Sequence, residues 1–322
     1  ATRRQNTTAD PLAGLYLPDG KGWKGANDTQ LTLMVNQEGL TEHVGDGSPD
    51  LEILEYLTNA EVRRCIPQAD INPVAKTCAL VGNAGVNLMS RFGEGIDSHE
   101  VVIRFNNGPT QRFESHVGRR TTFRLINNLW STHLTTRTSP LHGTQDSAYV
   151  MFGKSSSKLL GKVCALRSPA EVFFMSSQMA YASRVIYHKV QQRLQCPNSE
   201  NCAMGHQTPP SGIEGVFLAL AICEQVSIYG FGVDEAAEKT AKYHYHDDIV
   251  GDRSVHAFGM QSRFLKALTK TGRVTLCVPK YASEACRGVD DSHPADGRTF
   301  SRWFRTASGQ KSARDRIKGT RV

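Results

Sequence analysis

A short segment rich in histidine could bind a phosphate and transfer a proton. His244, Tyr245, His246 and Asp247 are consecutive, and His256 follows twelve residues after His244, at the start of a helical pattern. An imidazole titrates near ~6.5, so one histidine can donate a hydrogen bond to a phosphate while another removes a proton as general base. The alternative is an ordinary pair of loop histidines. A metal held by His244, His246 and Asp247 is disfavoured, because no further Cys, His or Glu ligands follow at helical spacing.

Three turns have the composition of phosphate-binding turns. Gly82-Asn83-Ala84-Gly85 joins an apolar strand to a helical pattern, and the N–H groups at a helix start bind anions. Asn106 ends the next strand, where ligands of parallel sheets usually bind, and Pro209-Pro210-Ser211-Gly212 precedes an apolar helix. A tight turn without a ligand and an ordinary Ser N-cap remain the alternatives. The dinucleotide fingerprint G-x-G-x-x-G fails at its middle glycine, which argues against an NAD dehydrogenase.

The sequence contains no Asp-x-Asp pair, which many nucleotide-sugar transferases use to hold a metal on a diphosphate. Negative charge on a leaving group must then be met by amides, hydroxyls, helix ends and histidine. We therefore expect no metal cofactor.

An alternation of short apolar runs and helical patterns must position these residues. It predicts one α/β domain built on a mostly parallel sheet with helices on both faces. Residues 1–50 read as a loose, polar N-terminal extension, residues 51–285 as the folded domain and residues 286–322 as a basic tail. Strands are expected at 78–82, 99–106, 121–128, 148–152, 171–176, 225–231 and 273–278, and helices at 51–64, 86–93, 178–194, 213–224 and 256–270.

The composition of the chain is that of a folded protein with a buried core and a basic surface. With 322 residues, 39% of them hydrophobic, the chain can bury a real core, and no run of 18 apolar residues predicts a membrane span. Neither does the start of the chain contain the apolar region of a signal peptide. The net charge of +7 favours an anionic partner. We favour a solvated C-terminal tail over a tail that contacts nucleic acid or acidic lipid, because most basic pairs are scattered.

The eight cysteines are compatible with disulfides formed in an oxidising compartment. No C-x2-C occurs, and the spacing of Cys196 and Cys202 does not suit a zinc site. Glycosylation sequons begin at Asn6 and Asn27. Together these features favour a luminal or secreted chain.

Four segments together resemble the sialylmotifs of the eukaryotic sialyltransferase family. Residues 78–128 are similar to the large motif, residues 209–232 to the small motif, residues 244–247 to the third motif, and the stretch from His256 to the very small motif. The end of the large motif is most similar to galactoside 2,6-type enzymes, and plant and algal relatives belong to the same family. The resemblance covers residues 74–270 and implies a Rossmann-like, glycosyltransferase-A-type fold.

The resemblance implies an inverting, metal-independent transfer of sialic acid from CMP-sialic acid, the co-substrate, to a hydroxyl of an acceptor glycan, most closely a galactose-terminated one. His256 matches the general base, and His244 matches the histidine that donates to the phosphate. The acceptor would be carried by a glycoprotein, glycolipid or polysaccharide. Nucleic acid is not an expected partner. Positions that match donor (CMP) contacts are Asn83, Asn106, Ser211, Gly212, Gly232 and His244.

The resemblance also implies a Cys78–Cys223 bridge and a type II protein of the Golgi lumen whose anchor is absent from this chain. Pairings of Cys196 with Cys202 and of Cys65 with Cys286 are guesses. Two positions depart from the family pattern, because Pro210 replaces a usual Ser and Gln261 replaces a usual Glu. They leave open a catalytically silent CMP-binding protein. Some plant and algal relatives use another donor, such as CMP-Kdo, or act as galactosyltransferases, so a different donor is a second alternative.

Overall fold

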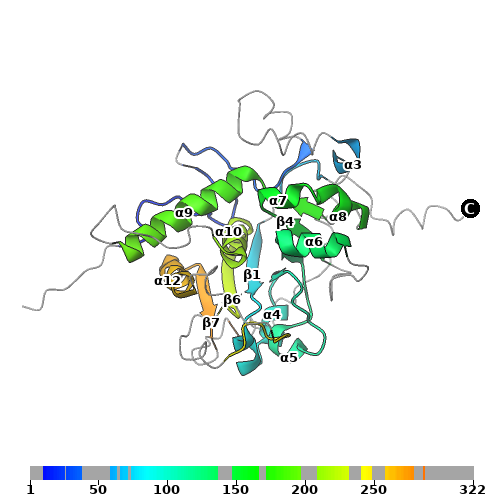
Figure 1. Ribbon diagram of the computed structural model, residues 1–322. Helices are drawn as coiled ribbons and strands as arrows, with labels where there is room; N and C mark the ends of the chain where they lie inside the picture. Colours follow the sequence, from blue (N-terminus) through cyan, green and yellow to red (C-terminus); the bar gives the residue numbers. More distant parts are fainter. Residues whose placement is uncertain are drawn as a thin grey trace, which may run out of the picture.

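The computed structural model describes the residues that form the sheet, most of its helices and part of the N-terminal segment (Figure 1). The described ranges are 10–25, 27–37, 59–63, 66–71, 74–136, 147–166, 172–196, 209–231, 241–248, 258–278 and residue 286.

Seven strands form a single parallel sheet in the order β5-β4-β3-β2-β1-β6-β7. Each apolar run that the sequence analysis assigned to a strand is one, so the predicted parallel α/β fold is confirmed. These runs are apolar at nearly every position because both faces of the sheet are covered. The strands are β1 (Ala75–Val81), β2 (Val101–Phe105), β3 (Phe123–Ile126), β4 (Ala148–Met151), β5 (Val172–Phe174), β6 (Cys223–Tyr229) and β7 (Val274–Cys277).

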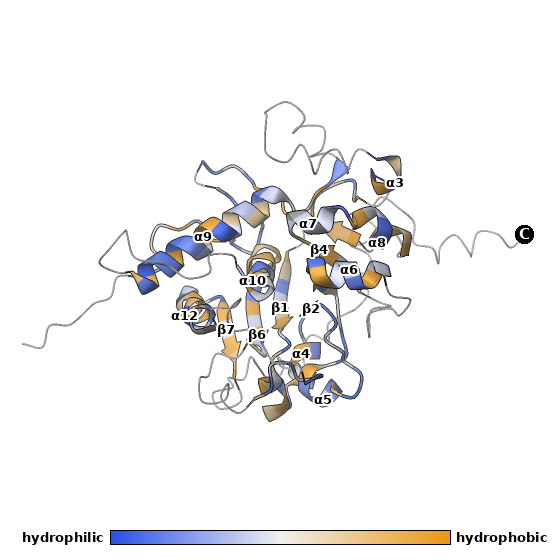
Figure 2. Cartoon of the chain, in the orientation of Figure 1, coloured by the Kyte–Doolittle hydropathy of each residue, from blue (hydrophilic) through white to orange (hydrophobic). Residues whose placement is uncertain are grey.

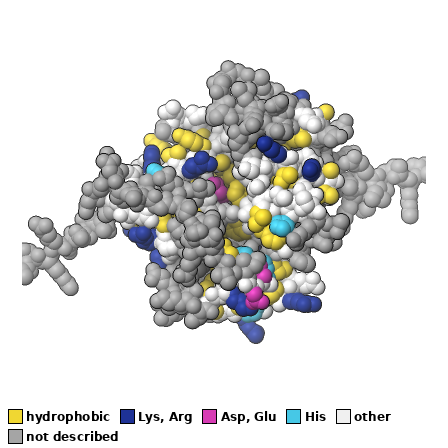
Figure 3. Space-filling view, in the orientation of Figure 1, with side chains coloured by type: hydrophobic (Ala, Val, Ile, Leu, Met, Phe, Trp, Pro, Cys, Tyr) yellow, Lys and Arg dark blue, Asp and Glu magenta, His cyan; other side chains and the backbone are white. Residues whose placement is uncertain are grey.

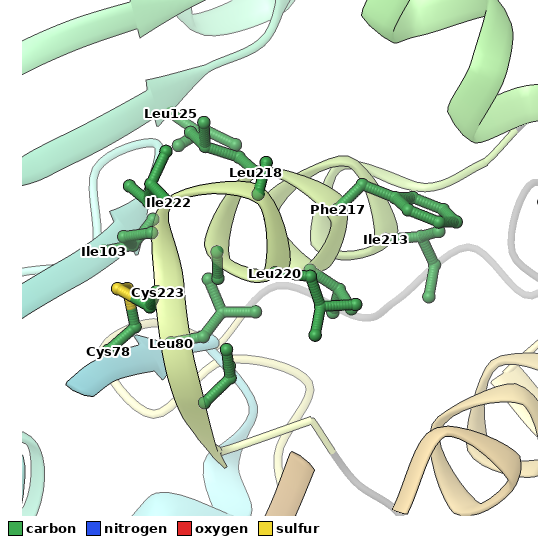
Figure 4. Close-up of a cluster of buried hydrophobic side chains, with 14 of the residues drawn as sticks. Cys78, Leu80, Ile103, Leu125, Ile213, Phe217, Leu218, Leu220, Ile222 and Cys223 are labelled. Carbon is green, nitrogen blue, oxygen red and sulfur yellow. A yellow bond between two sulfur atoms is a disulfide. The ribbon is translucent and has the colours of Figure 1, made fainter. Parts of the chain in front are cut away.

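Three long helices cover one face of the sheet: α9 (Ser177–Gln195), α10 (Ser211–Ile222) and α12 (Phe258–Leu268). The central one, α10, is apolar all round and almost completely buried, as expected for a helix between a sheet and other helices. Its residues Leu218 and Ile222 pack against side chains of β2 and β3 (Figure 4). By contrast, α9 alternates between hydrophilic and hydrophobic residues along its length (Figure 2).

Shorter helices cover the opposite face, which confirms the prediction of helices on both sides. Over β3, β4 and β5 lie α3 (Ala60–Arg63), α6 (Asn128–Thr136) and α8 (Leu160–Leu166), with α7 (Lys154–Ser157) beside α6. Over β1 and β2 lie α4 (Gly93–Asp97) and α5 (Glu114–Val117). No helix in the described ranges combines the length and the apolar character needed to cross a membrane.

The helix expected at 86–93 is wrong. A short 3₁₀ helix spans Gly85–Met89, Ser90 is extended with φ −138° and ψ 166°, and α4 begins only at Gly93. The buried Asn87 side chain donates to the carbonyl of Gly82 at 2.8 Å, a local bond that holds the turn in this shape. The helices expected at 178–194, 213–224 and 256–270 are confirmed within the described residues. Of the helix expected at 51–64, only α3 lies among the residues that the structure describes.

The described part of the N-terminal segment is not loose, so this expectation is wrong for residues 10–37. Trp23 is 1% exposed and stacks on Phe217 of α10, with ring centroids 5.1 Å apart. Met34 is fully buried and forms a bridge to Met175, directly after β5. An indole and a thioether bury much apolar area, which outweighs the polar average of the segment. The division of the chain into three parts stays a prediction, and residues 287–322 lie outside the described ranges.

Two disulfides lie within the described residues. Cys78 and Cys223 join β1 to β6 across a sequence separation of 145, as the resemblance implies. Cys277 at the end of β7 pairs with Cys286, so the guessed Cys65–Cys286 bridge is wrong. A partner nine residues away needs far less loop closure than one more than two hundred residues away. The guess for Cys196 and Cys202 lies outside the description, because Cys202 does.

Candidate functional site

The strand order creates a switch point in the middle of the sheet. From β1 the chain proceeds outward through β2 to β5, and then returns to place β6 on the other side of β1. In such sheets ligands bind beyond the carboxyl ends of the strands at this point. Asn83 follows β1, Asn106 follows β2 and Phe231 follows β6, so all three lie at this edge.

The two donor asparagines of the sequence analysis lie side by side. Asn83 Nδ2 donates to the carbonyl of Phe105 at 3.2 Å, and the Asn83 side chain packs so closely on Gly108 that any Cβ there would collide with it. Asn106 has a φ of 48°, a left-handed conformation that Asn tolerates better than most residues. Its Oδ1 accepts from the Asn127 N–H at 3.2 Å. The first turn and the loop after β2 therefore form one continuous surface.

The start of α10 joins this surface through the Phe231 ring. A side chain at either Gly82 or Gly212 would collide with that ring, so the two turns pack on opposite parts of the same aromatic group. Ser211 is the first residue of the helix and Pro210 is the N-cap, without a side-chain hydrogen bond to the helix. The alternative of an ordinary Ser N-cap is therefore wrong. The N–H groups of Ile213 and Glu214 donate to the Pro210 carbonyl, and the contact of Gly212 with the Phe231 ring places this helix start beside the switch point.

The segment that contains His244 and His246 is hydrogen-bonded both to the turn after β1 and to the loop after β2. The Tyr245 N–H donates to the Asn83 carbonyl at 2.9 Å, and the Tyr245 hydroxyl donates to the Pro109 carbonyl at 2.5 Å. Burial raises the pKa of Tyr245 to about 12, against the opposing effect of Arg104 and Arg124, so its hydroxyl keeps its proton at neutral pH. These two bonds place His244 directly beside the asparagine turn.

The two imidazoles of this segment share one carboxylate. His244 Nδ1 lies 3.0 Å from Asp247 Oδ2, and His246 Nδ1 lies 3.3 Å from the same oxygen. The rings of His244 and His246 stack with centroids 5.1 Å apart. The three ligand atoms lie within 4.8 Å of one another, close enough to share a metal ion. Because hydrogen bonding already accounts for the short distances, these contacts do not require a metal, and metal independence stays a prediction.

A buried carboxyl group near the start of α10 was missed by the sequence analysis. Glu214 is 7% exposed, and the Ser183 hydroxyl of α9 donates to its Oε2 at 2.6 Å. Burial raises the pKa of Glu214 to about 7, although the Ser183 bond and nearby Arg184 oppose this shift. The signal was present in the sequence, because Glu214 is the single charged residue in the apolar run 211–223.

We expect Glu214→Gln to remove a pH dependence of stability. An unfolded Glu ionises near 4.5 and the folded one near 7, so the folded state holds this proton more tightly and stability falls as pH rises between these values. The difference corresponds to about 3 kcal/mol. Chemical unfolding at pH 5 and pH 8 should show that the variant gains stability relative to wild type at pH 8. Exposed Glu224 on β6 is the matched control, and an equal response of Glu224→Gln would contradict the assignment to Glu214.

The structure brings most of the expected site residues together, and two lie outside its description. Asn83, Asn106, Gly212 and His244 meet at one edge of the sheet, and Ser211 begins the helix at the same point. Gly232 and His256 are not among the described residues. The departure Gln261 lies beside Gly212, where its amide would crowd any side chain on that glycine. Basic side chains on the visible face are dispersed rather than gathered into one block (Figure 3).

The chain is similar in sequence to known galactosyltransferases and sialyltransferases. The chain is 28% identical over 226 residues to a β-1,6-galactosyltransferase of Arabidopsis thaliana, covering 63% of this chain and 53% of that protein. It is 29% identical over 192 residues to β-galactoside α-2,6-sialyltransferase 2 of Danio rerio, covering 56% and 37%. The chain thus spans about half the length of these relatives or less. The crystal structure of a mammalian sialyltransferase superposes with a TM-score of 0.51 at 18% identity, over 76% of this chain and 89% of that one, which supports the fold.

A family sequence model matches the part of the chain that contains the motifs and most of the sheet. The sequence model of glycosyltransferase family 29 (sialyltransferase) matches residues 48–273, well over half of the chain. That range includes all seven strands except the last, the two asparagine turns, the start of α10 and the histidine segment. The chain therefore belongs to glycosyltransferase family 29, the sialyltransferase family.

Proposed function

We propose that the protein is an inverting, metal-independent glycosyltransferase that moves sialic acid from CMP-sialic acid to a hydroxyl of a galactose-terminated glycan. The observation that carries this proposal is the convergence of two asparagine turns, one helix start and His244 at the switch point of the sheet. Amide groups suit the base and ribose of a nucleotide, and the helix start suits its phosphate.

The reaction needs a base at the acceptor and positive charge at the leaving group. The acceptor oxygen attacks the anomeric carbon and its proton passes to His256, while the bond from that carbon to the phosphate oxygen breaks and CMP leaves with the electron pair. His244 donates a hydrogen bond to the departing phosphate. A charged imidazole ~4 Å from a phosphate is worth about 4 kcal/mol at an effective dielectric constant of about 20, before desolvation.

A second candidate is the same chemistry with another sugar donor. The Arabidopsis relative is a galactosyltransferase. Pro210 is the N-cap of α10, and Gln261 of α12 lies beside Gly212 at the start of α10. A neutral amide at Gln261 changes the charge beside Gly212 relative to the usual Glu. The third candidate is a catalytically silent protein that still binds CMP. The same two departures, Pro210 and Gln261, would be the reason for its lack of turnover.

The deciding experiment is a donor screen on the full chain with a galactose-terminated acceptor. CMP-Neu5Ac, CMP-Kdo and UDP-galactose are compared by product mass, each with and without EDTA. The proposal expects transfer from CMP-Neu5Ac that survives EDTA. Transfer from one of the other donors would establish the second candidate, CMP binding without any product would establish the silent one, and a strict Mn²⁺ requirement would contradict the mechanism.

We also propose that the protein acts in the Golgi lumen. Disulfides within the described fold and the exposed sequon residue Asn27 support an oxidising, glycosylating compartment. Acceptors carried by glycoproteins, glycolipids or polysaccharides would all be encountered there.

Asn106→Ala is expected to weaken CMP binding about tenfold, because one amide contact to a ligand is worth about 1.4 kcal/mol. Alanine is also strained at φ 48°, so Asn106→Gly serves as the matched variant that removes the amide without this strain. Calorimetric titration with CMP should show the same loss in both variants. Wild-type affinity in Asn106→Gly would mean that the donor does not contact this side chain.

A further inference from the structure

Two arginines are buried side by side in the middle of the sheet. Arg104 on β2 and Arg124 on β3 are paired across the two strands, with exposures of 1% and 0%. A charged side chain is costly to bury, and hydrogen bonds from each guanidinium offset part of this cost. Apolar residues would cover these strand positions at lower cost.

The two guanidinium groups hold different parts of the chain. Arg104 donates to the carbonyl of Val117, the last residue of α5, at 2.6 Å and to that of Arg120 at 2.9 Å. Arg124 Nη1 donates to the carbonyl of Asn106 at 2.7 Å and to that of Gly108 at 3.0 Å. Arg124 therefore contacts the loop after β2 that carries the donor asparagine, whereas Arg104 contacts the end of α5 and the segment before β3.

The loop 106–109 needs such an anchor to keep its shape. Asn106 is left-handed, and Gly108 must stay in contact with the Asn83 side chain. Of its four carbonyls, those of Asn106 and Gly108 accept from Arg124, and that of Pro109 accepts from the Tyr245 hydroxyl. Buried donors on both sides thus hold the backbone of the loop from which the Asn106 side chain extends, and the Asn127 N–H holds its Oδ1.

We propose that Arg124 is a positioning residue for donor binding: its buried guanidinium fixes the loop 106–109 so that Asn106 and Asn83 face one nucleotide. A lysine keeps the positive charge but presents it as a compact ammonium on a flexible stem, without the planar, fixed array of N–H donors that guanidinium has. The geometry of the loop, rather than the charge alone, depends on arginine here. This inference rests on the proposed function, because it assumes a CMP-containing donor at the asparagine turns.

The test compares Arg124→Lys with Arg104→Lys, which has the same chemistry, nearly the same burial and an adjacent strand position. For each folded variant we would measure the affinity for CMP by calorimetry, the free energy of unfolding, and amide hydrogen exchange of the two anchored segments. We expect both variants to lose stability. Only Arg124→Lys should bind CMP about tenfold or more weakly, equivalent to about 1.4 kcal/mol, and show faster exchange at residues 106–109. Arg104→Lys should show faster exchange at 117–121 with nearly wild-type affinity.

The outcomes separate this inference from the proposed function. If the wild-type chain does not bind CMP, the proposed function fails first. If it binds CMP and Arg124→Lys binds equally well, or if both variants lose affinity equally, the positioning role is overturned. Should Arg124→Lys not fold, Tyr245→Phe releases the same loop at Pro109 without touching β3. Weaker CMP binding by that variant would support the positioning of the loop, and unchanged affinity would overturn it.

Discussion

Replacing His256 by alanine is expected to lower the rate of glycosyl transfer by about 10²–10⁴-fold and to leave the affinity for CMP unchanged. This is the usual contribution of a general base, which acts on the acceptor hydroxyl and does not touch the nucleotide. Initial rates at saturating donor and acceptor, together with CMP titration of the same preparation, provide the measurement.

His244→Ala is the informative comparison, because the proposed mechanism puts that imidazole at the phosphate. It should lower both transfer and CMP affinity, whereas His188→Ala on α9 should change neither. Full activity in His256→Ala would remove this residue from the mechanism. An equal loss of CMP affinity in His256→Ala and His244→Ala would show that the two histidines do not have separate roles as general base and phosphate donor.

Removing the Cys78–Cys223 bridge by a double alanine substitution is expected to lower the free energy of unfolding by up to about 5 kcal/mol. The bridge closes a loop across 145 residues, and in the chain-entropy description the gain from a cross-link grows with loop length. It also joins β1 to its neighbour β6, on the two sides of the proposed donor site. Denaturant unfolding without reductant gives the measurement.

The Cys277–Cys286 bridge provides a control within the same protein. Its partners are nine residues apart, and the same description gives about 3 kcal/mol for its removal. The double alanine variant at these positions should therefore be less destabilised. Equal losses from both bridges would mean that loop closure is not what makes the longer bridge stabilising.

The strands of the sheet could be predicted from the sequence because they are short, apolar on both faces and bounded by turn residues. Even buried Arg104 and Arg124 did not obscure the runs VVIRF and FRLI that contain them. The turn residues around Asn83, Asn106 and Gly212 were readable for a related reason, since polar and glycine residues directly after apolar runs mark the carboxyl edge of a parallel sheet.

Features that depend on tertiary contacts could not be predicted from the sequence. A helix was expected at 86–93, but the Asn87 side-chain bond to Gly82 and the extended Ser90 interrupt it. The N-terminal segment is polar on average, and its anchoring residue Trp23 has its partner, Phe217, nearly two hundred residues away. Helix α6 was not expected because its sequence, NLWSTHLTT, is rich in residues of low helix propensity. Roles of the buried Glu214 and Arg124 likewise follow only from their partners.

The position of β1 between β2 and β6 has a consequence for biosynthesis. One neighbour, β2, leaves the ribosome soon after β1, but the other, β6, ends 148 residues after β1 does. At roughly 5–20 residues per second, one edge of β1 stays without its partner for on the order of 10 s, and the Cys78 thiol stays without Cys223 for the same time. Nascent chains should therefore depend on chaperones and disulfide isomerases during this interval, when Cys164 and Cys196 have already been synthesised.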